Sequence, residues 1–176
     1  DGKTLAQTEP DELSRAGIAR SFQITNVFPD LTVNENIRLA VQSRNPQAMN
    51  MWKNVASFPT INSKTTELVD FLGLQGLEDV LASDLSYGGQ RLLEIGIAIS
   101  TCPRVLLLDE PLVGLAAQER ERIIGLVKSL SKYIAVLLIE HDIDRVFEFS
   151  DYITVMNAGN VLVSGTSDEI RTNKQV

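Results

Sequence analysis

Residues 104–111 read Arg-Val-Leu-Leu-Leu-Asp-Glu-Pro, and this stretch decides the fold. Four consecutive apolar residues, 105–108, end in two carboxylates and a proline. A continuous apolar run is typical of a parallel strand whose sheet is covered by helices on both faces. Ligands of such sheets bind beyond the carboxyl ends of the strands. The stretch therefore predicts an α/β fold with a buried parallel sheet, whose functional edge carries Asp109 and Glu110.

Asp109 and Glu110 are the first candidate site residues. Because successive side chains of a strand point to opposite sides, two adjacent carboxylates can have different tasks. One can hold a divalent cation, while the other orients or deprotonates a water molecule. The alternative is a structural strand whose acidic end only caps the next helix, and a motif this short does not exclude it.

The composition is that of an ordinary globular domain. A chain of 176 residues with 44% hydrophobic content can bury a single core. The net charge of -7 argues against a nucleic-acid partner, because neutralising phosphates requires clustered Lys and Arg. The single cysteine, Cys102, is expected as a small buried residue in a reducing compartment. No apolar run approaches the roughly 20 residues of a membrane helix, so membrane contact is expected only through partners.

A second motif lies upstream of the strand. Residues 85–91 read Leu-Ser-Tyr-Gly-Gly-Gln-Arg and precede a helix pattern over 92–100. Ser86 is a natural N-cap, and Gly88 and Gly89 let the backbone approach a phosphate closely. The free amides and partial positive charge of a helix N-terminus favour anions. The motif therefore predicts a phosphate site.

A third motif lies downstream, where the apolar run 134–139 ends just before His141. A helix pattern over 116–130 links this run to the first one, so we expect two neighbouring parallel strands joined by a right-handed crossover. A lone histidine is more often structural than functional. Its place at a strand end, beside the strand that bears Asp109, favours a functional role instead.

In order and spacing, these motifs resemble those of the ABC-type ATPases, and the resemblance covers the whole chain. It identifies 85–89 as the signature, 105–110 as the Walker B strand and 114–116 as the D-loop. His141 corresponds to the switch histidine, and Gln23 corresponds to the Q-loop glutamine.

The resemblance implies a partial ABC ATPase domain of the P-loop NTPase type over residues 1–176. Its core would be a parallel sheet, built from residues 1–23 and 101–176. A helical subdomain would be inserted over about residues 24–100, where the apolar runs give way to helix patterns and polar loops.

Local signals add three predictions of secondary structure. Residues 10–16 begin with proline and acids and precede a glycine, which is typical of a short helix. Thr32 and Glu35 have the spacing of a capping box before a second helix. Residues 151–163 are expected to form a hairpin around Asn-Ala-Gly-Asn, before a final helix.

The resemblance also implies the cofactors, ATP and Mg²⁺, and a role for each site residue. Asp109 would hold Mg²⁺, and Glu110 would act as the catalytic base or orient the attacking water. His141 would hold the γ-phosphate, and Gln23 would contact both the metal and the water. Three signature residues would bind the γ-phosphate of an ATP molecule held by a second subunit: Ser86, Gly88 and Gly89.

The chain departs from the family pattern at several positions. Residues 2–4 read Gly-Lys-Thr, but a P-loop requires an earlier glycine and a preceding strand, so Asp-Gly is expected to be a tight turn. We therefore expect a truncated domain that lacks the Walker A segment and is inactive alone. Ala116 replaces the usual aspartate or asparagine of the D-loop, and Gly89 replaces the signature glutamine. Tyr87 replaces the first glycine of the signature, as in amino-acid importers.

The predicted function is that of an ATP-hydrolysing motor subunit of an ABC importer, most similar to the branched-chain amino-acid importers. Its predicted partners are a second ATPase subunit, identical or different, and transmembrane permease subunits, so the chain would lie in the cytoplasm on the inner face of the membrane. One alternative is a soluble ABC-type ATPase acting on nucleic acid or ribosomes, but residues 24–83 contain neither heptads nor a basic cluster. The other is a truncated dimer partner that does not hydrolyse ATP.

Overall fold

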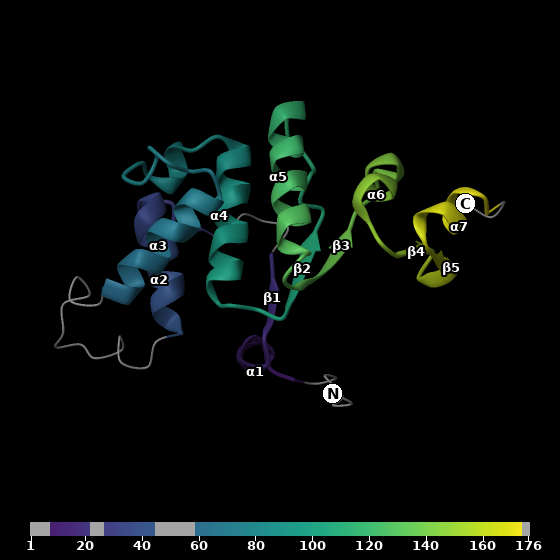
Figure 1. Cartoon of the computed structure of the whole chain (residues 1–176), viewed down its shortest axis with the longest axis horizontal. Helices are drawn as coiled ribbons and strands as arrows, with labels where there is room; N and C mark the ends of the chain where they lie inside the picture. Colours follow the sequence, from purple (N-terminus) through teal and green to yellow (C-terminus); the bar gives the residue numbers. More distant parts are fainter. Residues whose placement is uncertain (1–7, 22–26, 45–58, 174–176) are drawn as a thin grey trace. The chain divides into compact units, whose positions relative to one another are not determined.

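The computed structural model describes residues 8–21, 27–44 and 59–173. The chain divides into two compact units, Asp1–Ile139 and Glu140–Val176 (Figure 1). Three parts of the sequence analysis lie outside the described residues. These are the Gly-Lys-Thr stretch at 2–4, the glutamine Gln23 and residues 45–58 of the predicted helical subdomain.

The first unit combines helices with parallel strands, as an α/β fold requires, and has a run of helices between its first two strands. In chain order they are α1 (Pro10–Arg15), β1 (Ile18–Arg20), α2 (Val33–Ser43), α3 (Pro59–Phe71), the 3-10 helix η3 (Ala82–Asp84), α4 (Tyr87–Ser100), β2 (Val105–Asp109), α5 (Ala117–Leu130) and β3 (Ala135–Ile139). The helix pattern over 92–100 extends back to Tyr87, and Ser86 is its N-cap, as predicted.

The sheet of the first unit is parallel, with the strand order β1-β2-β3 (Figure 1). Val105 is the partner of both Ile18 in β1 and Ala135 in β3. Asp109, the last residue of β2, is paired with Ile139 at the end of β3. The prediction that the two apolar runs form neighbouring parallel strands is therefore confirmed.

The prediction that these strands are buried on both faces is wrong for the described residues. In β2 only Leu106 and Leu108 are fully buried. In β3, Leu137 and Ile139 leave 58% and 57% of their surface exposed. Side chains alternate across a strand, so the described elements bury one face of β2, whereas no residue of β3 is fully buried.

Helices α2, α3 and α4 pack against one another beside the sheet (Figure 1). The Thr32–Glu35 capping box is present: Oγ1 of Thr32 accepts the Glu35 amide, and Oε2 of Glu35 accepts the Thr32 amide. Helix α4 approaches its neighbours closely at Gly96, where a Cβ atom would overlap the side chain of Leu72 and lie 2.8 Å from Ile37. A residue without a side chain allows this approach.

Cys102 follows helix α4 and is exposed, so the prediction that it is buried is wrong. Its backbone has a φ of 51°, and its amide donates to the carbonyl oxygen of Ile99 at 2.9 Å. The cysteine therefore closes the last turn of the helix instead of filling the core.

The second unit contains α6 (Ile143–Phe149), β4 (Ile153–Asn157), β5 (Asn160–Gly165) and α7 (Ser167–Arg171). The two strands pair in an antiparallel hairpin, as predicted. Ala158 and Gly159 connect them with positive φ angles of 48° and 79°, the geometry of a tight hairpin turn. Among the described residues, no helix has the length and hydropathy needed to span a membrane.

Candidate functional site

The two candidate carboxylates lie at the carboxyl end of β2. Asp109 is the last strand residue, and the amide of Glu110 still donates to the carbonyl oxygen of Ile139 in β3, at 2.9 Å. Glu110 itself has a φ of 46°. This left-handed conformation costs a non-glycine residue about 1 to 3 kcal/mol, and such residues cluster at functional sites. Nothing in the sequence pointed to it, because a following proline favours an extended conformation and not a left-handed one.

Asp109 has a partner that the sequence analysis missed, Arg20 at the end of β1. The guanidinium Nη2 of Arg20 lies 3.2 Å from Oδ2 of Asp109. The aspartate side chain is 15% exposed and that of the arginine 57%. Since 89 residues separate the two in sequence, only the pairing of β1 with β2 brings them together.

A magnesium ion suits Asp109 only as one ligand among several. The described residues contain no group of three or more His, Cys, Asp and Glu side chains that could hold a metal ion. Mg²⁺ is commonly held by one or two carboxylates, while water and substrate phosphates complete its octahedral shell. A single aspartate at the strand end fits that mode, although Arg20 already engages one of its oxygens.

The signature residues form the capped N-terminus of α4, as predicted. The hydroxyl oxygen of Ser86 accepts the Gly89 amide at 3.1 Å. The Ser86 hydroxyl in turn donates to Oε1 of Glu119 at 2.9 Å, and the Gly88 amide donates to the same oxygen at 3.2 Å. The predicted anion site is therefore in contact with a carboxylate of helix α5, which the sequence analysis did not foresee.

The position of Glu119 explains its ionisation. Hydrogen bonds from the Ser86 hydroxyl, the Ala116 amide and the Gly88 amide, in that order, lower the pKa of the Glu119 carboxyl below its usual value. Each donor stabilises the charged form more than the neutral form. The N-terminus of α4 thus has an ionised carboxylate beside it at neutral pH.

Tyr87, the residue that departs from the commonest signature, lies against the D-loop. A Cβ atom on Gly114 would be 3.2 Å from the tyrosine ring, and Gly114 has a φ of 77°. On the helix side, the guanidinium of Arg91 lies 5.6 Å from the centre of the same ring. Arg91 also forms a buried ion pair with Glu94, with Nη1 2.7 Å from Oε2. Tyr87 therefore connects the signature helix to the D-loop.

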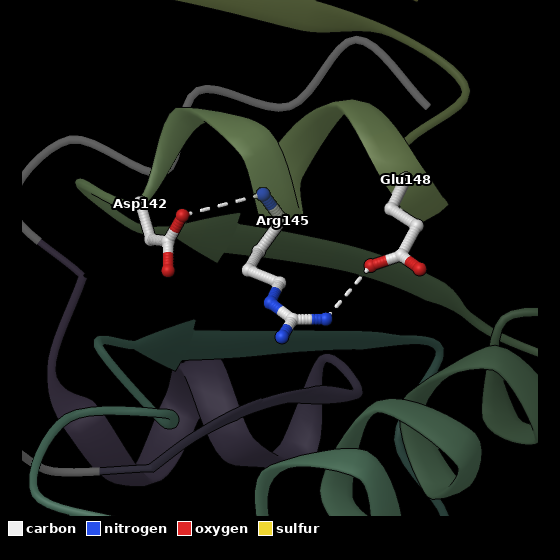
Figure 2. Close-up of polar contacts among 3 residues, drawn as sticks. All are labelled: Asp142, Arg145 and Glu148. Atoms are coloured by element: carbon white, nitrogen blue, oxygen red, sulfur yellow. Dashed lines mark hydrogen bonds and ion pairs between the residues drawn. The ribbon is translucent and has the colours of Figure 1, made fainter. Parts of the chain in front are cut away.

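His141 belongs to the second unit and is described within it. Its side chain is 71% exposed, with Nδ1 3.9 Å from Oε2 of Glu140. Helix α6 begins directly afterwards, and Figure 2 shows Asp142 accepting the Arg145 amide and Arg145 paired with Glu148. The two contacts measure 3.4 Å and 3.1 Å. The exposure argues against a histidine packed into a core.

Known proteins resemble the chain along its whole length. The family model described as ABC transporter matches residues 1–113. The chain is 34% identical to the high-affinity branched-chain amino acid transport ATP-binding protein BraF of Pseudomonas aeruginosa, covering 100% of the chain and 72% of the relative. It is also 34% identical to the corresponding LivG protein of Escherichia coli K12, covering 94% of the chain and 68% of the relative.

Solved structures agree with these relatives. A nucleotide-free ATP-binding cassette from an ABC transporter superposes with a TM-score of 0.79 at 29% identity, covering 99% of this chain and 72% of that one. The ADP conformation of an ATP-binding cassette superposes with a TM-score of 0.79 at 31% identity, covering 96% and 68%. The chain therefore belongs to the ABC transporter family and is an ABC-type ATPase, similar to the ATP-binding subunits of that family.

Proposed function

We propose that the chain is the motor subunit of an importer for branched-chain amino acids, in which ATP hydrolysis drives transport through a membrane partner. The observation that carries this proposal is the pair Asp109 and Glu110 at the carboxyl end of β2, with Glu110 held in a strained conformation. The names of the two 34% identical relatives support the substrate class.

Within this proposal, the site residues divide the hydrolysis of ATP among them. Bound Mg²⁺ would neutralise the negative charge on the phosphates. Asp109 would contribute one oxygen to the metal, and Glu110 would take a proton from the attacking water or orient it. His141 would donate a hydrogen bond to the γ-phosphate, a role that its exposed ring permits. Gln23 would contact the metal and the water, since an amide offers both a donor and an acceptor.

The signature would act on a second subunit. Ser86, Gly88 and Gly89 present their donors at the N-terminus of α4, an arrangement suited to the γ-phosphate of ATP bound by a partner copy or a related subunit. We assign α2, α3 and α4 to the helical subdomain, over about residues 24–100, and residues 1–23 and 101–176 to the core of the domain.

The proposed partners also determine the location. Transmembrane permease subunits would carry the amino acid, and the ATPase would bind them from the cytoplasm, on the inner face of the membrane. Coupling would need no nucleic acid, which agrees with a net charge of -7.

Uptake by the reconstituted transporter tests this function. The full-length subunit and its permease would be placed in vesicles loaded with ATP, with the ATPase facing the lumen, and the entry of labelled leucine and labelled glutamate would be compared. We expect ATP-dependent uptake of leucine in excess over glutamate. Equal uptake of both, or uptake of neither alongside active ATP hydrolysis, would contradict the proposed substrate class.

A further inference from the structure

The carboxylate of Glu119 occupies the N-terminus of the signature helix. Its Oε1 atom accepts both the Ser86 hydroxyl, at 2.9 Å, and the Gly88 amide, at 3.2 Å. Glu119 lies on α5, 33 residues from Ser86 in sequence, so the contact does not belong to the local capping of α4. The helix already has its own cap, since the Ser86 oxygen accepts the Gly89 amide.

The absence of a side chain at Gly88 leaves the space that this carboxylate fills. A Cβ atom on Gly88 would lie 2.5 Å from both Cδ and Oε1 of Glu119, closer than any nonbonded contact allows. A phosphate oxygen that accepts the Gly88 amide would need the same position as Oε1, because a backbone N–H makes one good hydrogen bond along its axis. The carboxylate and a phosphate therefore exclude each other.

The second oxygen of Glu119 holds the start of its own helix. Oε2 accepts the amide of Ala116, at 3.2 Å, and Ala116 is the N-cap residue of α5 at the end of the D-loop. The methyl group of Ala116 cannot accept the Glu119 amide, so of the two hydrogen bonds of a capping box only the one from the Ala116 amide to Glu119 forms. If the Glu119 side chain moved away, the Ser86 hydroxyl and the Gly88 amide would lose their acceptor. The Ala116 amide at the D-loop end of α5 would lose its acceptor at the same time.

We propose that Glu119 is an internal anion that occupies the signature site of the resting subunit and must leave before a phosphate binds there. This inference rests on the proposed function, because the proposed function makes a phosphate the ligand of the signature donors. Glu119 would then lower the affinity of the signature for phosphate. It would also couple the binding of phosphate to the conformation of the D-loop. Glu119 would thereby take over a task of the aspartate or asparagine that the family usually has where this chain has Ala116.

Replacing the charge tests the competition. The Glu119→Gln variant keeps an oxygen acceptor but loses the negative charge. A matched control is Arg122→Gln, one turn further along α5, whose guanidinium donates to the carbonyl oxygen of Gly73 and not to the signature. Inorganic phosphate would be titrated into the ¹⁵N-labelled chain at constant pH and ionic strength, and the amide signals of Gly88 and Gly89 would report binding.

We expect Glu119→Gln to bind phosphate about two- to fivefold more tightly than the parent chain, as removing a charge from a helix terminus predicts. The Arg122→Gln control should match the parent. Equal or weaker binding by Glu119→Gln, or no phosphate-dependent shift of Gly88 in any variant, would overturn the proposal.

A second measurement needs no substitution. In the parent chain, phosphate should shift the carboxyl ¹³C signal of Glu119 and the amide signal of Gly88 with one dissociation constant. A Gly88 signal that moves while Glu119 stays fixed would show that the carboxylate does not compete. The titration requires no catalysis, so its failure is distinct from failure of the proposed function, which would appear as a transporter that does not couple hydrolysis to uptake.

Discussion

Arg20 and Asp109 form an ion pair where two neighbouring strands end, with Nη2 3.2 Å from Oδ2. The pair holds the positive charge of Arg20 beside the Asp109 carboxylate, which we propose as a ligand of the magnesium ion. A metal ion and a guanidinium repel each other and compete for the same oxygen. Arg20 would therefore raise the magnesium concentration that the site requires.

Removing Arg20 should make magnesium bind more easily. For Arg20→Gln we expect the Mg²⁺ concentration at half-maximal ATP hydrolysis to fall about two- to fivefold, the range of a partly exposed ion pair. Steady-state hydrolysis by the full-length subunit across a Mg²⁺ series measures this. Arg20→Lys keeps the charge and is the control. A rise in the requirement for Mg²⁺ in Arg20→Gln would show that Arg20 assists the metal.

Breaking the buried ion pair of α4 should destabilise the fold strongly. The side chains of Arg91 and Glu94 are each only 5% exposed. Glu94→Ala leaves the guanidinium without this carboxylate, so we expect the free energy of unfolding to fall by about 3 to 5 kcal/mol. Urea denaturation followed by circular dichroism measures the change.

A surface pair with the same sequence spacing provides the control. Arg145 and Glu148 form an ion pair on α6 (Figure 2). Their side chains are 33% and 52% exposed. Glu148→Ala should cost at most about 1 kcal/mol. If Glu94→Ala and Glu148→Ala lowered the free energy of unfolding by similar amounts, burial would not increase the contribution of the α4 ion pair to stability.

Adding a side chain at Gly96 should also destabilise the protein. A Cβ atom there meets Leu72 and Ile37, two fully buried side chains, so Gly96→Val forces repacking at a cost of about 1 to 3 kcal/mol. Thermal unfolding measures the loss.

Gly125 on α5 is the matched position, because a Cβ atom there meets nothing within 4 Å. Gly125→Ala should raise stability by about 0.5 to 1 kcal/mol, the difference in helix propensity between the two residues. A loss of stability at Gly125 comparable to that at Gly96 would indicate a general intolerance of helix glycines, not a close approach.

The capping box of α2 should make stability depend on pH. Hydrogen bonds from Thr32, above all from its backbone amide, lower the pKa of Glu35 in the folded chain. Folding lowers the pKa of this carboxyl, so its ionised form stabilises the folded protein at every pH above the pKa of the unfolded chain, which is about 4.3. This stabilisation is lost as the pH falls through the pKa of the folded chain. Glu35→Gln should therefore have a lower Tm than the parent at pH 7. The difference should shrink below pH 4. A constant difference would contradict the assignment.

Local chemistry was readable in the sequence, whereas contacts between distant segments were not. The Ser86 cap and the Thr32–Glu35 box depend on a few neighbouring residues, and both are present. The pairs formed by Arg20 with Asp109 and by Glu119 with Ser86 depend on which strands and helices meet, which periodicity does not specify. The apolar run 134–139 correctly predicted a strand but not its exposed face, since the run does not say what covers the sheet.

The most direct test of the central claim is single-turnover hydrolysis of ATP by the full-length subunit carrying Glu110→Gln. The amide keeps the shape of the side chain and the strained turn but cannot accept a proton from water. We predict that ATP binding is retained while hydrolysis slows by about two to four orders of magnitude, the usual contribution of a positioned acid–base group. Hydrolysis within a few fold of the parent rate would remove Glu110 from the mechanism and contradict the proposed site.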